Sequence, residues 1–194
     1  MRIISGTLKG RPIKFLKNTN TRPLKNSVRE SIFNILSHSK KIKVNISNSE
    51  ILDLYSGIGS FGIECVSRGA KKVTFIEQDF LATKSLKENL IKLSIINFTK
   101  VYFCKIEEIL SKNIYDKFDV IFLDPPFKDS SFLDNLKTIK NKKLFNDKHI
   151  LIIHRENNSK DNFNELIKII EIKIYGRSKI IFAVFKWEIF LYKF

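Results

Sequence analysis

The chain has 194 residues, of which 43% are hydrophobic and 28% are charged. This composition predicts one globular domain and excludes collagen-like, disordered and disulfide-rich proteins. The longest apolar run, residues 180–185, is far shorter than the roughly 18 residues of a membrane span, so we expect no membrane partner. Cys65 and Cys104 have no second cysteine pair nearby, which favours a reducing compartment, the cytoplasm, over a disulfide framework or a zinc site.

The charge of the chain is strongly positive and unevenly distributed. Thirty-five Lys and Arg residues against 20 Asp and Glu residues give a net charge of +15, which is typical of proteins that bind a polyanion. The first 50 residues contain eleven basic and two acidic residues. Guanidinium groups bind phosphates through paired hydrogen bonds, and four of the seven Arg residues lie in the first 29 positions. We therefore predict that nucleic acid contacts four arginines, Arg2, Arg11, Arg22 and Arg29. The alternative is that these residues form an ordinary solvated basic surface.

The N-terminal part of the chain has its own pattern. Residues 1–20 alternate short apolar stretches with glycine and proline, as a β-hairpin or an extended arm does. A helix is expected next, with Ser27 and Glu30 forming a capping box at its start. Helical spacing predicts an apolar stripe made of Val28, Ile32, Phe33, Ile35 and Leu36.

A polar and basic stretch, residues 39–49, follows this helix and is interpreted as a connector. It divides the chain into a small N-terminal appendage of basic arm and helix, residues 1–45, and a main domain, residues 46–194. The appendage carries the predicted nucleic-acid contacts.

From residue 50 onward, strands and helices alternate. Strands are predicted at 51–54, 72–77, 98–103, 118–123 and 150–154, and helices at 60–68, 80–93, 106–112 and 131–140. Two further β-rich runs, 167–175 and 179–187, are separated by a short turn and form an antiparallel hairpin. This order predicts an α/β fold with a doubly wound, Rossmann-like sheet that is mostly parallel.

A glycine-rich turn follows the first strand of the main domain. Gly57, Gly59 and Gly62 have the spacing G-x-G-x-x-G, which also occurs in dinucleotide-binding proteins, so a nicotinamide cofactor is one interpretation. However, Asp53 precedes the glycines, and its carboxylate would repel a pyrophosphate. The same carboxylate would favour the amino group or the ribose of S-adenosylmethionine.

Glu77 ends the second strand, 20 residues after Gly57. Folds of this type place a carboxylate there that accepts hydrogen bonds from both ribose hydroxyls. The alternative is an ordinary exposed acid at the end of a strand.

The tetrapeptide Asp124-Pro125-Pro126-Phe127 follows an apolar strand, at the sheet edge where open α/β folds bind ligands. The prolines fix the backbone and leave carbonyl oxygens as acceptors. An exocyclic amine is a poor nucleophile, and acceptors such as the Asp124 carboxylate and the Pro125 carbonyl would orient its lone pair toward a methyl donor. Phe127 would offer a ring on which the base stacks.

The three histidines give only weak evidence of a functional site. His38, His149 and His154 have no metal-ligand spacing, so we expect no metal site, and the last two are interpreted as polar residues at strand ends.

These motifs together resemble the bacterial 16S rRNA guanine-N2 methyltransferases of the RsmD type. The N-terminal arm, Arg22-Pro23, the helix start at 27–34, the glycine turn, Ile76-Glu77 and the Asp124–Phe127 tetrapeptide all match. The resemblance implies a class I methyltransferase fold and S-adenosylmethionine as cofactor, and it implies 16S rRNA or a partly assembled small ribosomal subunit as partner. It assigns the cofactor to Asp53, Ser56, Gly57, Gly59, Glu77, Gln78, Ile106 and Asp124, and catalysis to Asp124, Pro125, Pro126 and Phe127.

The chain departs from the family pattern at Leu24, where Thr is usual, and at Lys105, where Asp or Asn is usual. The Lys105 departure leaves the backbone N–H of Ile106 as the expected partner of the cofactor's adenine. Three alternatives remain open: a DNA adenine-N6 methyltransferase, a non-catalytic RNA-binding assembly factor, and a nicotinamide-dependent dehydrogenase.

Overall fold

The computed structural model describes residues 1–15, 24–112, 116–163 and 165–186. Within them, seven strands form one sheet in the order β3-β2-β1-β4-β5-β7-β6. Neighbouring strands from β3 to β5 pair in parallel, and β7 is antiparallel to both β5 and β6. The strands are β1 Glu50–Leu54, β2 Lys72–Glu77, β3 Thr99–Phe103, β4 Phe118–Leu123, β5 Phe145–Glu156, β6 Ile167–Tyr175 and β7 Ser178–Phe185. The mostly parallel sheet with an antiparallel C-terminal hairpin is confirmed.

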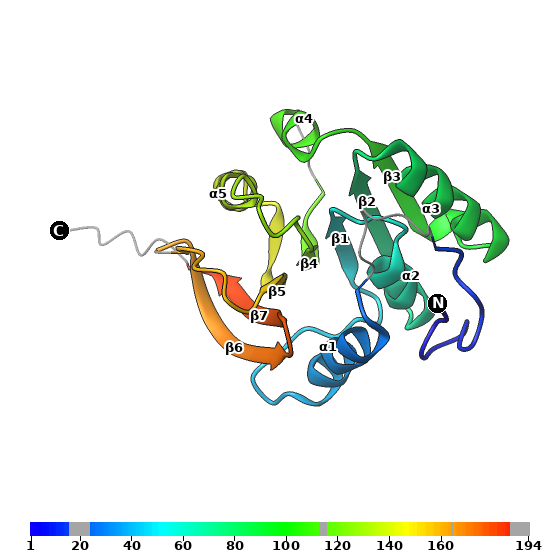
Figure 1. Cartoon of the computed structure of the whole chain (residues 1–194), viewed down its shortest axis with the longest axis horizontal. Coiled ribbons are helices and arrows are strands. Elements are labelled where there is room, and N and C mark those ends of the chain that lie inside the picture. Colours follow the sequence, from blue (N-terminus) through cyan, green and yellow to red (C-terminus); the bar gives the residue numbers. More distant parts are fainter. Residues whose placement is uncertain (16–23, 113–115, 164, 187–194) are drawn as a thin grey trace.

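Helices cover both faces of this sheet (Figure 1). The side chains of α1 to α3 pack with strand residues such as Ile51 and Phe75 in one apolar cluster. Those of α4 and α5 pack with the alternate residues, such as Leu52 and Leu54, in a second cluster. The helices are α1 Asn26–His38, α2 Ser60–Ser67, α3 Phe80–Lys92, the 3-10 turn η1 Ile96–Phe98, α4 Ile106–Ser111 and α5 Phe132–Asn141. The doubly wound arrangement is therefore confirmed.

The first residues form a hairpin-like loop that is tied to α2. Arg2 and Pro12 form an antiparallel bridge. The buried Glu64 carboxylate accepts hydrogen bonds from the backbone N–H groups of Ile4 and Ser5, at 2.8 and 2.9 Å. This segment is thus held by α2 instead of projecting from the domain.

Residues 39–49 differ from the predicted polar connector. Ile42, Val44 and Ile46 are buried in the same apolar cluster as α1 and α2, while the alternate residues Lys41 and Lys43 are exposed. Alternate residues of an extended segment point to opposite sides, so a basic sequence can still bury an apolar edge. The division at residue 45, as a boundary of function, stays a prediction.

The start of α1 also differs from prediction. The helix begins at Asn26 with Lys25 as its cap, and no side chain makes a capping hydrogen bond. Ser27 lies inside the first turn and is exposed, so it is too far along the helix to cap it, and the predicted capping box is wrong. The apolar stripe is confirmed, because four of its five members are buried and Ile35 is half-buried.

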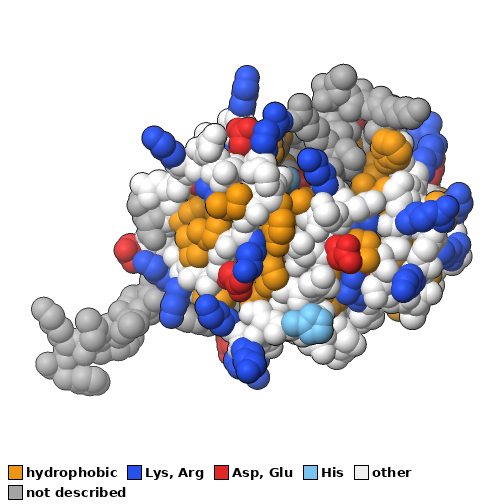
Figure 2. Space-filling model, turned by 60° about the horizontal axis from the view of Figure 1, so that its bottom comes forward, with side chains coloured by type: hydrophobic (Ala, Val, Ile, Leu, Met, Phe, Trp, Pro, Cys, Tyr) orange, Lys and Arg blue, Asp and Glu red, His pale blue; other side chains and the backbone are white. Residues whose placement is uncertain are grey.

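The basic character of the chain is visible on its surface. On the face shown in Figure 2, Lys and Arg side chains are scattered more densely than Asp and Glu side chains. Hydrophobic side chains also gather on this face (Figure 2). Three isoleucines of β6 are exposed, namely Ile169, Ile172 and Ile174.

Candidate active site

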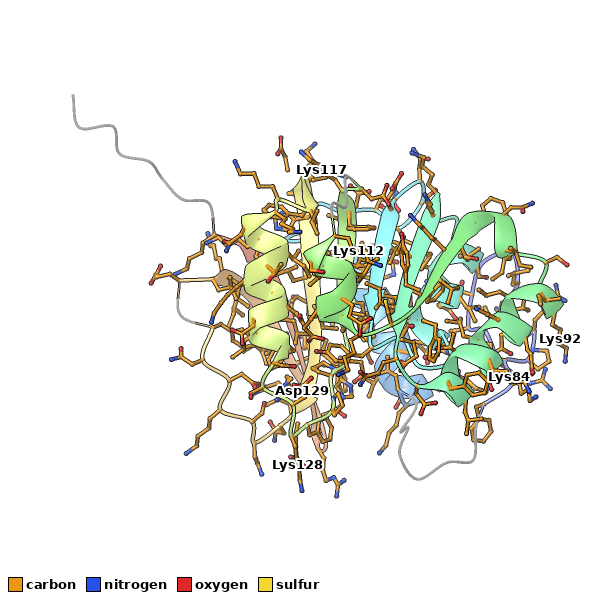
Figure 3. All side chains as sticks on the ribbon, turned by 90° about the horizontal axis from the view of Figure 1, so that it is seen from above. Lys84, Lys92, Lys112, Lys117, Lys128 and Asp129 are labelled. Carbon is orange, nitrogen blue, oxygen red and sulfur yellow. The ribbon has the colours of Figure 1, made fainter. Side chains whose placement is uncertain are left out.

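A cavity of about 730 Å³ lies at the carboxyl ends of the parallel strands, within the size range of small-molecule sites. Figure 3 shows Lys128 and Asp129, which follow β4, at this end of the sheet and Lys117, which precedes β4, at the other. The structure brings most of the predicted site residues together here. Those that line the cavity are Ser56, Gly57, Glu77, Gln78, Ile106, Asp124, Pro125, Pro126 and Phe127.

Glu77 and the glycine turn form one wall. Gly57 and Gly59 both have positive φ angles, +54° and +80°, which glycine adopts without strain. The Glu77 carboxylate accepts hydrogen bonds from the backbone N–H groups of Gly57 and Asp79, each at 2.7 Å. In a dinucleotide site the glycine-turn N–H groups would face a pyrophosphate, and here a carboxylate already binds one of them. This arrangement disfavours the nicotinamide interpretation.

Asp53 lies behind this wall and does not line the cavity. It is 1% exposed, and its Oδ2 accepts a hydrogen bond from the Gly62 N–H at 3.0 Å. Burial raises the pKa of its carboxyl well above the ordinary value. The prediction that Asp53 faces the cofactor is therefore corrected: it holds the start of α2 against β1. Gly59 does not line the cavity either. It packs against the apolar core, because a Cβ there would collide with the side chains of Leu86 and Phe75.

The Asp124–Phe127 tetrapeptide follows β4 and forms the second wall of the cavity. Hydrogen bonds from Arg155 hold its backbone in place. The Arg155 guanidinium donates to the carbonyl oxygens of Pro126 and Phe127, each at 3.1 Å, and pairs with Asp161. The Pro125 carbonyl has no hydrogen-bond partner among the described residues. The loop thus keeps one acceptor available beside the Asp124 carboxylate.

His154, which the sequence indicates only as a polar residue at a strand end, lines this site. Its Nδ1 lies 2.7 Å from Oδ1 of Asp124, and its ring meets the Phe127 ring edge to face at 5.8 Å. The contact arises because Leu123 and Ile153 are paired in the β4–β5 register. The strand pairing is the signal that could have found it, and the linear sequence does not display it.

A second polar cluster was also missed. Asn135 on α5 donates to the Tyr55 hydroxyl at 3.2 Å and to the Glu107 carboxylate at 2.9 Å. Burial raises the pKa of the Tyr55 hydroxyl. These contacts join three elements around the cavity, whose lining also includes Phe15 and Leu24 from the N-terminal segment.

The four predicted phosphate-binding arginines divide into three groups. Arg2 and Arg11 are exposed, and their guanidinium groups donate to the carbonyl oxygens of Gly10 and Lys92. Arg22 lies outside the described residues. Arg29 is fully buried and donates to the carbonyl of Arg2 at 2.5 Å, so its prediction as a phosphate contact is wrong. It clamps the first residues of the chain onto α1.

No group of three or more metal-binding side chains occurs among the described residues. No helix among them is both long and apolar enough to cross a membrane.

Comparisons with known proteins agree with this architecture. The family model described as conserved hypothetical protein 95 matches residues 1–184. The chain is similar to ribosomal RNA small subunit methyltransferase D of Buchnera aphidicola subsp. Baizongia pistaciae, with 36% identity over 157 residues, which are 81% of this chain and 76% of that protein. The enzyme of the same name from Buchnera aphidicola subsp. Acyrthosiphon pisum is also 36% identical, over 79% of this chain and 77% of its own.

A solved structure from Escherichia coli shares the fold, with a TM-score of 0.81 and 24% identity over 94% of this chain and 96% of the other. Sheet order, cavity and sequence relatives thus lead to one family. The chain belongs to the conserved hypothetical protein 95 family, together with the proteins named ribosomal RNA small subunit methyltransferase D.

Proposed function

We propose that this protein transfers a methyl group from S-adenosylmethionine to the exocyclic N2 of a guanine in 16S rRNA, in the cytoplasm. The observation that carries the proposal is the pair of walls in one cavity: Glu77 with the glycine turn on one side, and Asp124 to Phe127 on the other. The names of the relatives support the rRNA substrate.

The residues of the first wall suit S-adenosylmethionine. The Glu77 carboxylate has lone pairs beyond those used by Gly57 and Asp79, and they would accept the ribose hydroxyls. Ser56, Gln78 and Ile106 complete the contacts that we propose. When bound, this cofactor supplies an electrophilic methyl group on a sulfonium sulfur.

The residues of the second wall suit a flipped base. Phe127 is half-buried at the cavity and would stack on the guanine. The Asp124 carboxylate and the Pro125 carbonyl would each accept one N2–H, which turns the nitrogen lone pair toward the methyl carbon.

The chemical step needs no strong base beforehand. Transfer of the cofactor's methyl group would form the nitrogen–carbon bond as the sulfur–carbon bond breaks, and positive charge would develop on N2. The cationic amine then loses one proton to the Asp124 carboxylate. Because the carboxylate stabilises charge that develops at N2, it acts mainly in the transition state.

The N-terminal segment would add contacts to the RNA. Its Phe15 lines the cavity and is exposed, and Arg2 and Arg11 are exposed on the same segment. Cations near a strand of RNA contribute affinity by releasing counterions. The net charge of +15 acts in the same direction.

Transfer of label from methyl-labelled S-adenosylmethionine tests the proposal. Purified protein is incubated separately with naked 16S rRNA, with partly assembled small subunits and with duplex DNA, and the labelled nucleoside is identified. We expect N2-methylguanosine in at least one substrate. Label in DNA adenine would favour the DNA methyltransferase alternative, and rRNA binding without any transfer would favour the non-catalytic alternative.

A further inference from the structure

The contact between His154 and Asp124 joins the ends of two neighbouring strands. Nδ1 of His154 and Oδ1 of Asp124 are 2.7 Å apart, and both side chains are mostly buried, with 10% and 22% of their surfaces exposed. Since a carboxylate oxygen can only accept, Nδ1 is the donor in this bond.

The other ring nitrogen makes no competing contact. Nε2 of His154 is buried and has no hydrogen-bond partner among the described residues. The bond from Nδ1 to Asp124 is therefore the one polar contact that fixes the orientation of the ring within the part of the chain that the structure describes.

The two oxygens of the Asp124 carboxylate differ in their contacts. Oδ1 is held by His154, so Oδ2, which has no partner among the described residues, is the oxygen available to the substrate amine. Oδ2 is then the atom that faces the cation developing on nitrogen.

Arg155, the residue after His154, fixes the backbone of the loop that follows Asp124. Arg155 fixes the Pro126 and Phe127 carbonyls from the same strand end, so the backbone of the loop is set independently of His154. What remains to be set is the rotation of the Asp124 side chain, and His154 is the described residue that binds it.

We infer that His154 is a positioning residue, which orients the Asp124 carboxylate so that Oδ2 receives the proton of the methylated amine. This inference rests on the proposed methyltransferase function. It assigns to the end of β5 a part in the reaction that the motifs of the sequence do not display.

The test compares two variants of equal shape. Asn and Leu are nearly isosteric, but only Asn retains an N–H donor close to the position of Nδ1. Single-turnover methyl transfer into rRNA is measured at saturating cofactor and RNA for the wild type, His154→Asn and His154→Leu. Steady-state KM values for both substrates are measured alongside.

We expect His154→Leu to slow transfer by about ten- to a hundredfold, the loss of one hydrogen bond to a charged group. We expect His154→Asn to recover most of the rate, and both KM values to change by less than about twofold, because His154 acts through Asp124 and not in binding. Equal rates in His154→Leu and wild type would overturn the inference. So would a His154→Asn variant as slow as His154→Leu.

A measurement without turnover gives an independent check. The chain has three histidines, so nitrogen NMR of histidine-labelled protein can assign each tautomer. We expect His154 to carry a proton on Nδ1 in the wild type, and a ring that is protonated on Nε2 alone would overturn the inference. If wild-type protein transfers no methyl group to any rRNA substrate, the proposed function fails and takes this inference with it, whereas wild-type transfer with equal variant rates refutes the inference alone.

Discussion

The Glu77 carboxylate bridges two loops by accepting the backbone N–H of Gly57 at 2.7 Å and that of Asp79 at 2.7 Å. Asp79 in turn caps α3, because its Oδ1 accepts the Ala82 N–H. The residue that we propose for the cofactor's ribose therefore also fixes the shape of the wall around it.

Replacing Glu77 by Gln keeps the size of the side chain but removes its charge. We expect S-adenosylmethionine to bind about ten- to a hundredfold more weakly, since hydrogen bonds to a charged acceptor contribute about 1.5–3 kcal/mol. Isothermal titration calorimetry with the cofactor and with NAD checks this. Preferential binding of NAD, or an unchanged affinity in the variant, would contradict the cofactor assignment.

Gly6 and Gly10 form a matched pair for testing how the N-terminal segment is attached. Both have φ angles near +80°, so Ala costs about 1 kcal/mol of strain at either position. A Cβ at Gly6 would also collide with the Ser67 carbonyl, whereas one at Gly10 meets no neighbour. We expect Gly6→Ala to lower the free energy of unfolding by about 1–3 kcal/mol more than Gly10→Ala, as measured by urea denaturation. Equal losses would mean that the segment is not packed on α2.

Burial of His149 makes the free energy of unfolding depend on pH. Its Nε2 accepts the Phe185 N–H at 2.9 Å and its Nδ1 bonds the Asn146 carbonyl, and burial lowers its pKa below the ordinary 6.5. The folded state thus binds fewer protons than the unfolded state, so this contribution to stability is present above pH 6.5 and is lost as the pH falls through the lowered pKa.

We expect the free energy of unfolding to fall less steeply below pH 6.5 in His149→Leu than in the wild type, because the variant cannot titrate there. His38→Asn, at an exposed position of α1, serves as the control and should keep the wild-type slope. An unchanged slope in His149→Leu would show that another group causes the pH dependence.

Variants of Arg11 and Arg29 distinguish a role in RNA binding from a role in stability. If Arg11 contacts RNA, Arg11→Ala should reduce the slope of log affinity against log salt by about 0.7. Arg29→Ala should instead lower the free energy of unfolding by about 2 kcal/mol or more, because it leaves buried carbonyl groups without donors. Filter binding across a salt series, with thermal melts of each variant, checks both. A lower salt slope for Arg29→Ala with unchanged stability would contradict its structural role.

Local sequence patterns predicted the alternation of strands and helices, and with it the cavity at the carboxyl ends of β1, β2 and β4. Glu77 and Asp124 could be placed because Glu77 ends one apolar strand and Asp124 directly follows another. The contact of His154 with Asp124 could not, because it depends on the pairing of strands 30 residues apart.

Arg29 shows a different limit. Counting charges treats every arginine as exposed, but Arg29 stands three and four positions before Ile32 and Phe33 and so shares their buried face on α1. Helical spacing was the signal that would have excluded it as a phosphate contact. The sequence also places Asp53 correctly near the end of β1, but it does not show that its side chain points toward α2 and away from the cavity.

The central claim is that Asp124 stabilises the transition state for methyl transfer. Single-turnover transfer at saturating RNA, measured beside RNA affinity for the wild type, Asp124→Asn and Asp124→Ala, tests it most directly. We predict that Asp124→Ala lowers the rate by about two orders of magnitude or more with little change in affinity, and that Asp124→Asn, which retains one acceptor oxygen, keeps part of the rate. An Asp124→Ala variant that binds RNA weakly yet transfers the methyl group at the normal single-turnover rate would contradict the account.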